Sequence, residues 1–167
     1  MNKRGHIPEE EAPIMMNQVI SAVKQWHKSG VIHWDIKDEN ILVTVDELSN
    51  TQIKLIDFGA AAVFEDKVYS NLCGTNVYSP PEWINNKFYQ GKSATVWSLD
   101  ILLHSLVVGN IPFLDRDQVL AHVLNIPQHL TLSNACHELI KWYLQGTPCD
   151  RPTLDQIANH LWFEQEE

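Results

Sequence analysis

The sequence predicts a mainly α-helical domain of the α+β class, in which one small β hairpin is embedded. Three observations lead to this prediction. Apolar residues recur at helical spacing close to the N-terminus, two short runs of β-type residues follow, and four more segments of helical pattern fill the second half. The chain has 167 residues, which is the size of one domain, and no repeat or linker divides it.

The first predicted helix lies ahead of residue 30 and buries one apolar face. Three glutamates at positions 9–11 stand before it, and acidic residues favour the positively polarised start of a helix. Gly30 suits its exit. Its apolar residues at helical spacing are Met16, Val19, Ile20, Val23 and Trp26. We expect this helix to hold the following loop, residues 33–40, on a rigid support.

Two β-type runs at residues 41–45 and 52–56 are joined by a polar stretch and predict a hairpin. The loop 33–40 ends where the first run begins, and Asp57 follows the end of the second run. Antiparallel pairing brings these two ends together. We therefore expect Asn40 and Asp57 to lie close to each other, with Asp35 nearby.

The later part of the chain begins with a long connection and continues as helices. Residues 59–82 show no clear periodicity, and a connection of this length inside a compact domain is usually functional. Ser93 is expected to cap a nearly all-apolar helix that runs to Gly109 and is buried on most sides. Three further helices are expected at about residues 116–125, 133–145 and 153–160, separated by prolines.

The charge balance and the cysteine content exclude several classes of function. A count of 12 basic against 21 acidic residues gives a formal net charge of −9, which argues against nucleic acid and is compatible with basic protein substrates. The three cysteines form no CxxC pair, and the eight histidines show no recognised metal-ligand spacing, so no zinc or redox site is expected. We expect a monomeric, soluble protein of the cytoplasm or nucleus, without a leader or a membrane segment.

Two motifs carry the chemistry. Residues 33–40 read His-Trp-Asp-Ile-Lys-Asp-Glu-Asn, and Asp57 opens an Asp-Phe-Gly tripeptide. Together they supply two carboxylates, an amide and an ammonium at spacings that suit phosphoryl transfer from a magnesium-bound nucleotide. Asp35 can receive the proton of an attacking hydroxyl, and Lys37 can contact the transferring phosphoryl group. Asn40 and Asp57 offer the hard oxygen ligands that Mg²⁺ prefers.

The full set of motifs, HxDxKxxN, Asp-Phe-Gly and then GTxxYSPPE, resembles the C-terminal lobe of a eukaryotic protein kinase. Lys37 and Thr75 match the serine/threonine class, and residues 35–40, 55–59, 77–83, 96–99 and 109–113 are most similar to the Pim kinases. The resemblance implies a C-terminal lobe over residues 1–167, with a catalytic loop at 33–40 and an activation segment at 57–82. The N-terminal lobe is expected to be absent, because the sequence contains no GxGxxG loop and no VAIK lysine.

The family's roles for the matching residues follow as implications of this resemblance. Asp35 would be the catalytic base, and Lys37 would contact the transferring phosphate. Asn40 and Asp57 would bind Mg²⁺ and, through it, ATP. The implied activity is transfer of the ATP γ-phosphate to serine or threonine residues of protein substrates.

Five other residues acquire expected roles in the same way. Thr75 would brace the catalytic base and lysine beside the substrate hydroxyl. Glu82 and Arg151 would form a buried ion pair that ties the activation segment to the lobe. Asp38 and Glu39 lie on the loop of the base, where acidic groups in Pim-like kinases favour arginine-rich substrates. Alternatively, they are two solvated loop carboxylates without such a role.

The sequence departs from the family pattern in places that leave a second hypothesis open. Trp34 stands where many kinases have an arginine that pairs with a phosphate on the activation segment, and an indole has one N–H and no charge. Asp100 stands inside the apolar helix where the family usually has glycine, so its carboxylate must find a donor, reach water or become protonated. These departures and the absent lobe are compatible with a pseudokinase-like lobe that binds peptides or a partner without transferring phosphate.

Overall fold

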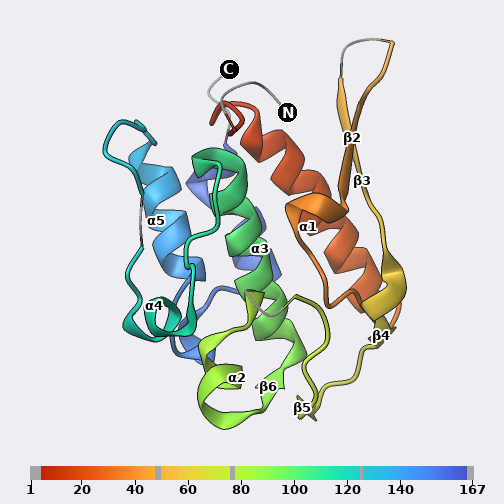
Figure 1. Ribbon diagram of the computed structural model, residues 1–167. Helices are drawn as coiled ribbons and strands as arrows, with labels where there is room; N and C mark the ends of the chain where they lie inside the picture. Colours follow the sequence, from red (N-terminus) through yellow and green to blue (C-terminus); the bar gives the residue numbers. More distant parts are fainter. Residues whose placement is uncertain (1–4, 48–49, 76–77, 125, 165–167) are drawn as a thin grey trace.

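Helices are the main elements of the fold and pack around a shared apolar core (Figure 1). The computed structural model describes residues 5–47, 50–75, 78–124 and 126–164. Helices α1 (Ala12–Lys28) and α5 (Asn134–Tyr143) lie on opposite sides of α3 (Gly91–Val108), and α6 (Leu154–Ala158) contacts α1. Helix α3 is buried along almost its whole length, as expected for a helix that is apolar on all sides.

Helix α1 is amphipathic, and its apolar face lies on the core, as predicted. Its buried apolar side chains include Met15, Met16, Val19, Ile20 and Val23. The helix ends at Lys28. Gly30 then takes a φ of 73°, a value that glycine adopts readily, where the chain turns into β1 (Val31–Ile32).

The three glutamates stand directly before α1, as expected from the sequence, and none of them lies in its first turn. Glu11 is the N-cap residue, but its side chain makes no capping hydrogen bond. Glu9 instead accepts hydrogen bonds from the N–H (2.8 Å) and the hydroxyl (2.5 Å) of Ser133 and from the indole N–H of Trp162 (2.9 Å). These tertiary bonds tie the start of the chain to α5 and to the 3-10 helix η5 (Leu161–Phe163).

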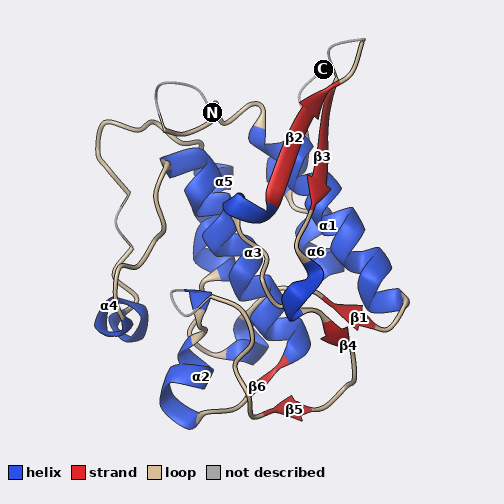
Figure 2. Ribbon diagram, turned by 45° about the vertical axis from the view of Figure 1, so that its right-hand side comes forward, coloured by secondary structure: helices blue, strands red, loops and turns tan. Residues whose placement is uncertain are grey.

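The predicted hairpin is present. Strand β2 (Ile41–Val45) pairs antiparallel with β3 (Thr51–Leu55) in a register that sets Ile41 opposite Leu55, and β3 lies one residue earlier than predicted. Figure 2 shows that the hairpin projects beyond the helices. Gln18 of α1 fixes the hairpin, because its side-chain amide bonds the carbonyl oxygen of Thr51 (2.9 Å) and the N–H of Ile53 (3.0 Å).

The connection after the hairpin contains short elements that the sequence pattern does not predict. Strand β4 (Ala62–Val63) pairs with β1, and β5 (Val68–Tyr69) pairs with β6 (Tyr89–Gln90). Helix α2 spans only Pro81–Asn86. Elements this short leave no measurable period in the sequence. The 3-10 helices η1 (Asp38–Asn40) and η2 (Phe58–Ala60) flank the hairpin.

Helix α3 begins at Gly91, and its N-cap residue is Gln90, three positions before the predicted cap Ser93. Ser93 lies inside the helix and donates its hydroxyl to the carbonyl oxygen of Gln90 (3.2 Å), so it is not the cap. Packing sets this start. A Cβ on Gly91 would lie 3.0 Å from Ile32 and 3.1 Å from Phe64, so glycine permits a close approach to β1 and to the segment after β4.

The last three predicted helices are present but shorter than expected. Helix α4 spans Arg116–Ala121, because His122 takes a left-handed φ of 53° and ends it; the predicted end, residue 125, lies outside the described residues. Ser133 caps α5, and Thr153 forms a capping box with Gln156 at the start of α6. The 3-10 helix η4 (Pro148–Asp150) lies between α5 and α6. Among the described residues, no helix is long and apolar enough to cross a membrane.

Asp100 carries an acidic group into the centre of the core. Its side chain is 0% exposed, and neither carboxylate oxygen has a hydrogen-bond partner among the described residues. Burial raises the pKa of Asp100 well above its ordinary value, and the charge of Arg151 offsets only part of that rise. Of the three outcomes open from the sequence, protonation is therefore the one that the structure supports.

Replacing Asp100 with alanine is expected to raise the free energy of unfolding at neutral pH by about 1–3 kcal/mol, the usual cost of a buried polar group without a partner. Because the pKa of Asp100 is raised in the folded state, the contribution of its protonated form to stability is fully present below about pH 4 and is lost as the pH rises through the folded pKa. Urea unfolding measured at about pH 5 and about pH 8 reports both effects.

The matched control is Asp100→Asn, which keeps the shape and the unpaired polar atoms but cannot ionise. It is expected to remove the part of the pH dependence of stability that Asp100 causes, and to retain most of the cost of burying an unpaired polar group. An alanine variant that is no more stable than the wild type at either pH would show that Asp100 has a partner in solution.

Candidate active site

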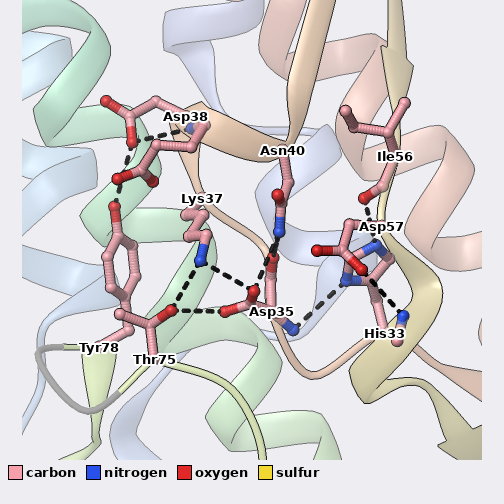
Figure 3. A network of polar contacts seen from close by, with 11 residues as sticks. His33, Asp35, Lys37, Asp38, Asn40, Ile56, Asp57, Thr75 and Tyr78 are labelled. Atoms are coloured by element: carbon pink, nitrogen blue, oxygen red, sulfur yellow. Dashed lines mark hydrogen bonds and ion pairs between the residues drawn. The ribbon is translucent and has the colours of Figure 1, made fainter.

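Asp35 lies at the centre of a polar network that joins the loop 33–40 to Thr75 in the connection after the hairpin (Figure 3). Its Oδ1 accepts a hydrogen bond from the hydroxyl of Thr75 (2.7 Å). Its Oδ2 accepts one from the side-chain amide of Asn40 (3.0 Å) and forms an ion pair with the ammonium of Lys37 (2.9 Å). The fold thus gathers three polar side chains around the carboxylate of Asp35.

Lys37 and Thr75 close this network into a ring. The Lys37 ammonium donates a hydrogen bond to the Thr75 hydroxyl oxygen (2.8 Å), and the same hydroxyl donates to Asp35. Thr75 therefore uses one oxygen as acceptor and donor at once. Since each side chain contacts both of the others, the three are positioned as a unit.

The carboxyl group of Asp35 is ionised. Burial alone raises its pKa, but hydrogen bonds from Lys37 and Thr75 and the charge of Lys37 outweigh burial and hold the pKa of Asp35 below its ordinary value. In turn, the hydrogen bond and charge of Asp35 raise the pKa of Lys37 against its burial. At neutral pH the pair is therefore a carboxylate beside an ammonium.

Asn40 and Asp57 lie at the hairpin end of the site. The Asn40 Nδ2 donates to the carbonyl oxygen (2.8 Å) and to the carboxylate (3.0 Å) of Asp35, so the amide oxygen faces away from them. Asp57 takes a left-handed φ of 63°, and its Oδ1 accepts a hydrogen bond from the N–H of Gly59 (3.1 Å). A backbone hydrogen bond from Ile56 to Asn40 (2.9 Å) keeps the two segments together. An amide oxygen and a carboxylate are donors that fit Mg²⁺.

His33 is a further residue of the candidate site, and the sequence motifs alone did not predict a role for it. Its Nδ1 accepts a hydrogen bond from the N–H of Asp35 (3.3 Å), and its Nε2 contacts the carbonyl oxygen of Ile56 (3.2 Å). Burial lowers the pKa of His33, so the imidazole is neutral and can donate through Nε2. It thereby bridges the loop 33–40 to the segment after β3. Its position as the first residue of the motif at 33–40 is the signal in the sequence that points to it.

Asp38 and Glu39 are adjacent in sequence but have different surroundings. Asp38 accepts hydrogen bonds from the hydroxyls of Ser105 (2.8 Å) and Tyr78 (3.4 Å). Burial and the neighbouring carboxylates raise the pKa of Tyr78, so its hydroxyl stays protonated and can donate. The Glu39 side chain is exposed. The solvated-carboxylate interpretation is therefore wrong for Asp38, which anchors the loop to α3, whereas the exposure of Glu39 is compatible with either interpretation.

Glu82 and Arg151 form a buried, bidentate ion pair. The Arg151 nitrogens Nη1 and Nη2 donate to Oε1 (2.9 Å) and Oε2 (2.7 Å) of Glu82. The guanidinium also bonds the carbonyl oxygens of Gln145 (2.8 Å) and Ser93 (3.1 Å) and lies 4.9 Å from the ring centroid of Trp97. Helix α2, which carries Glu82, is thereby fastened to α3 and to the segment after α5.

Comparison with known proteins assigns the family of this chain. Residues 1–163, which include every site residue described above, match the protein kinase domain. The chain belongs to the protein kinase family. Its relatives include serine/threonine-protein kinase pim-2 of Danio rerio, which is 42% identical over 163 residues. That alignment covers 98% of this chain and 51% of the relative.

Two further kinases show the breadth of the match. Serine/threonine-protein kinase prk-2 of Caenorhabditis elegans is 38% identical over 165 residues, which are 98% of this chain and 37% of the relative. NUAK family SNF1-like kinase 1 of Homo sapiens is 34% identical over 166 residues, which are 97% of this chain and 24% of the relative. The chain thus spans about half, or less, of the length of these kinases.

Proposed function

We propose that this chain supplies the catalytic residues of a serine/threonine protein kinase that transfers the γ-phosphate of Mg-ATP to protein substrates. The ring of Asp35, Lys37 and Thr75 is the observation that carries the proposal. It holds an ionised acceptor and a cation side by side, and phosphoryl transfer requires mainly positioning and charge stabilisation.

The proposed roles follow from the charges and contacts of the site. The ionised Asp35 accepts the proton of the attacking serine or threonine hydroxyl. Lys37 contacts the transferring phosphoryl group, and Thr75 holds both side chains beside the substrate. Asn40 and Asp57 are the residues that would hold Mg²⁺. When bound, that ion neutralises charge on the ATP phosphates.

We also propose that the chain corresponds to the C-terminal lobe of the kinase domain. Apolar side chains around the site are exposed, including Leu42 (50%), Val43 (52%), Ile56 (36%) and Phe58 (47%). Exposed apolar surface of this kind marks an interaction site. Neither a GxGxxG loop nor a VAIK lysine occurs in the 167 residues. A nucleotide-covering lobe is therefore the partner that we assign to this surface.

For the substrate we propose a protein segment rich in arginine, as in Pim-like kinases. The exposed carboxylate of Glu39 lies on the same loop as Asp35 and can meet a cationic side chain of the substrate, whereas Asp38 is engaged by Ser105 and Tyr78. The net charge of −9 agrees with a basic substrate.

The experiment is transfer from Mg-ATP to an arginine-rich serine peptide by the full-length protein, with the Asp57→Asn variant. The variant is expected to lose about a hundredfold or more in rate, because the charge of a metal ion on a phosphate is worth several kcal/mol in the transition state. Asp66→Asn is the matched control: Asp66 is an exposed carboxylate on the activation segment, and this change should leave the rate unaltered.

The alternative function is a lobe that binds peptides or a partner without transferring phosphate. Trp34 and Asp100 are the residues that favour it, since both depart from the family pattern. The two functions predict different results in the same assay. Transfer at background level that is unchanged in Asp57→Asn, together with retained binding of the arginine-rich peptide, would establish the alternative.

A further inference from the structure

Trp34 occupies a conformation that a bulky side chain rarely adopts. It precedes Asp35 directly, and its φ of 66° lies in the left-handed region. Such a conformation persists only where the surroundings hold it in place, and it often marks a functional position. The contacts of the indole and of the Trp34 backbone show what holds it.

The indole of Trp34 packs edge-on against two tyrosines from separate strands. Its ring centroid lies 4.9 Å from that of Tyr69, at 79° between ring planes, and 5.1 Å from that of Tyr89, at 88°. Tyr69 on β5 is the direct partner of Tyr89 on β6, and their rings are stacked at 5.9 Å. Edge-to-face arrangements are favourable for aromatic rings. We call these three residues the aromatic clasp.

The two tyrosine hydroxyls of the clasp form hydrogen bonds with the backbone of the activation segment. The Tyr69 hydroxyl accepts a hydrogen bond from the N–H of Glu65 (3.0 Å) and donates to the carbonyl oxygen of the same residue (3.1 Å). The Tyr89 hydroxyl donates to the carbonyl oxygen of Asn71 (2.8 Å). Three hydrogen bonds therefore attach the backbone of Glu65 and Asn71 to the clasp.

The backbone of Trp34 meets the same segment a few residues further on. Gly74 takes a φ of 87°, and a Cβ there would lie 2.2 Å from the carbonyl oxygen of Trp34. Only glycine permits this approach. The next residue, Thr75, donates its hydroxyl to Asp35 (2.7 Å). The contact of Trp34 with Gly74 thus fixes the point from which Thr75 reaches the site.

We propose that Trp34 is a positioning residue that holds the activation segment in place by aromatic packing, so that alignment of Thr75 with Asp35 requires no phosphate on that segment. This inference rests on the proposed kinase activity. An indole offers one N–H and no charge, so it cannot replace a phosphate-binding cation. A phosphate on Tyr69 would remove the hydroxyl that bonds Glu65 and would place charge beside that acidic residue, so it would open the clasp.

The test compares two Trp34 variants, one of which removes the aromatic ring at position 34 and one of which keeps a ring there. Asparagine tolerates the left-handed region, so Trp34→Asn removes the rings' partner without adding strain, whereas Trp34→Phe keeps an aromatic ring. Trp142→Ala is the matched control, because Trp142 lies on α5 and packs against His160. Tyr69→Leu removes a different ring of the aromatic clasp and leaves Trp34 in place.

Hydrogen exchange of the amides of residues 65–75 is the first readout. In Trp34→Asn and Tyr69→Leu these amides are expected to exchange about tenfold faster or more, because ring packing that stabilises the closed segment is lost. Exchange in α5 should not change in either variant, and Trp34→Phe and Trp142→Ala should match the wild type in residues 65–75. Unchanged exchange of these amides in both Trp34→Asn and Tyr69→Leu would overturn the inference.

Phosphoryl transfer by the full-length protein is the second readout. Trp34→Asn is expected to lower kcat while the KM for ATP stays the same. Trp34→Phe is expected to keep the kcat of the wild type. Phosphatase treatment of the wild type should leave its rate unchanged. A wild-type rate that is lost on phosphatase treatment would overturn the inference while leaving the kinase proposal intact. Absence of transfer in every form would remove the kinase proposal, and exchange would still decide whether the clasp holds the segment.

Discussion

Replacing Arg151 with methionine is expected to lower the free energy of unfolding by about 3–5 kcal/mol. The change leaves the buried carboxylate of Glu82 without the two hydrogen bonds that the guanidinium donates to it. It also removes the bonds to the carbonyl oxygens of Ser93 and Gln145. A urea unfolding curve at neutral pH measures the loss.

A double variant separates the lone buried charge from the lost contacts. Combining Glu82→Leu with Arg151→Met is expected to recover part of the stability, because no ion then remains in the core. Lys24→Met is the matched control: it breaks an ion pair with Asp155, whose side chain is 79% exposed, and should change stability little. An Arg151→Met variant as stable as this control would show that the buried pair does not fasten α2.

Replacing Asp35 with asparagine is expected to reduce kcat for phosphoryl transfer by about 10²–10⁴-fold, the usual contribution of a positioned general base. The substitution keeps the size of the side chain but removes its ability to take up the proton of the substrate hydroxyl. The KM for the peptide should change little, because substrate binding does not depend on that proton. Steady-state kinetics of the full-length protein with the arginine-rich peptide measure both constants.

The pH profile gives a second readout for the same residue. Because hydrogen bonds and the charge of Lys37 hold the pKa of Asp35 below its ordinary value, the carboxylate is available above that pKa and is lost as the pH falls through it. The acidic limb due to Asp35 should therefore lie below about pH 4. A limb centred well above that pH and absent in Asp35→Asn would contradict the lowered pKa.

Sequence patterns within single elements predicted the main helices and the hairpin. The apolar spacing of α1 and the β-type runs of the hairpin are visible in the sequence, because each element shows its own period over enough residues. Cap residues such as Ser133 and Thr153 likewise act on their own helix. The start of α3 was misplaced because close packing of Gly91, not a cap, determines it.

The sequence motifs pointed to the residues of the candidate site but not to the contacts that connect them to the rest of the fold. Spacing alone brings Asp35, Asn40 and Asp57 to one end of the hairpin. It does not show that Asp38 bonds Ser105, which lies 67 positions away, or that Glu9 bonds Trp162 across 153 positions. Nor does it show that Trp34 meets Tyr69 and Tyr89. Such partners depend on tertiary packing, which no local pattern encodes.

Single-turnover mixing of excess full-length protein with Mg-ATP and an arginine-rich serine peptide tests the proposed chemistry most directly. Mass spectrometry of the quenched peptide counts phosphoserine formed in one round, so slow release of product does not hide the chemical step. We predict phosphoserine with the wild type and a loss of about a hundredfold or more in its rate of formation with Asp35→Asn. Equal phosphoserine from both proteins, or none above the level of ATP and peptide alone, would contradict the assignment of Asp35 as the base of a protein kinase.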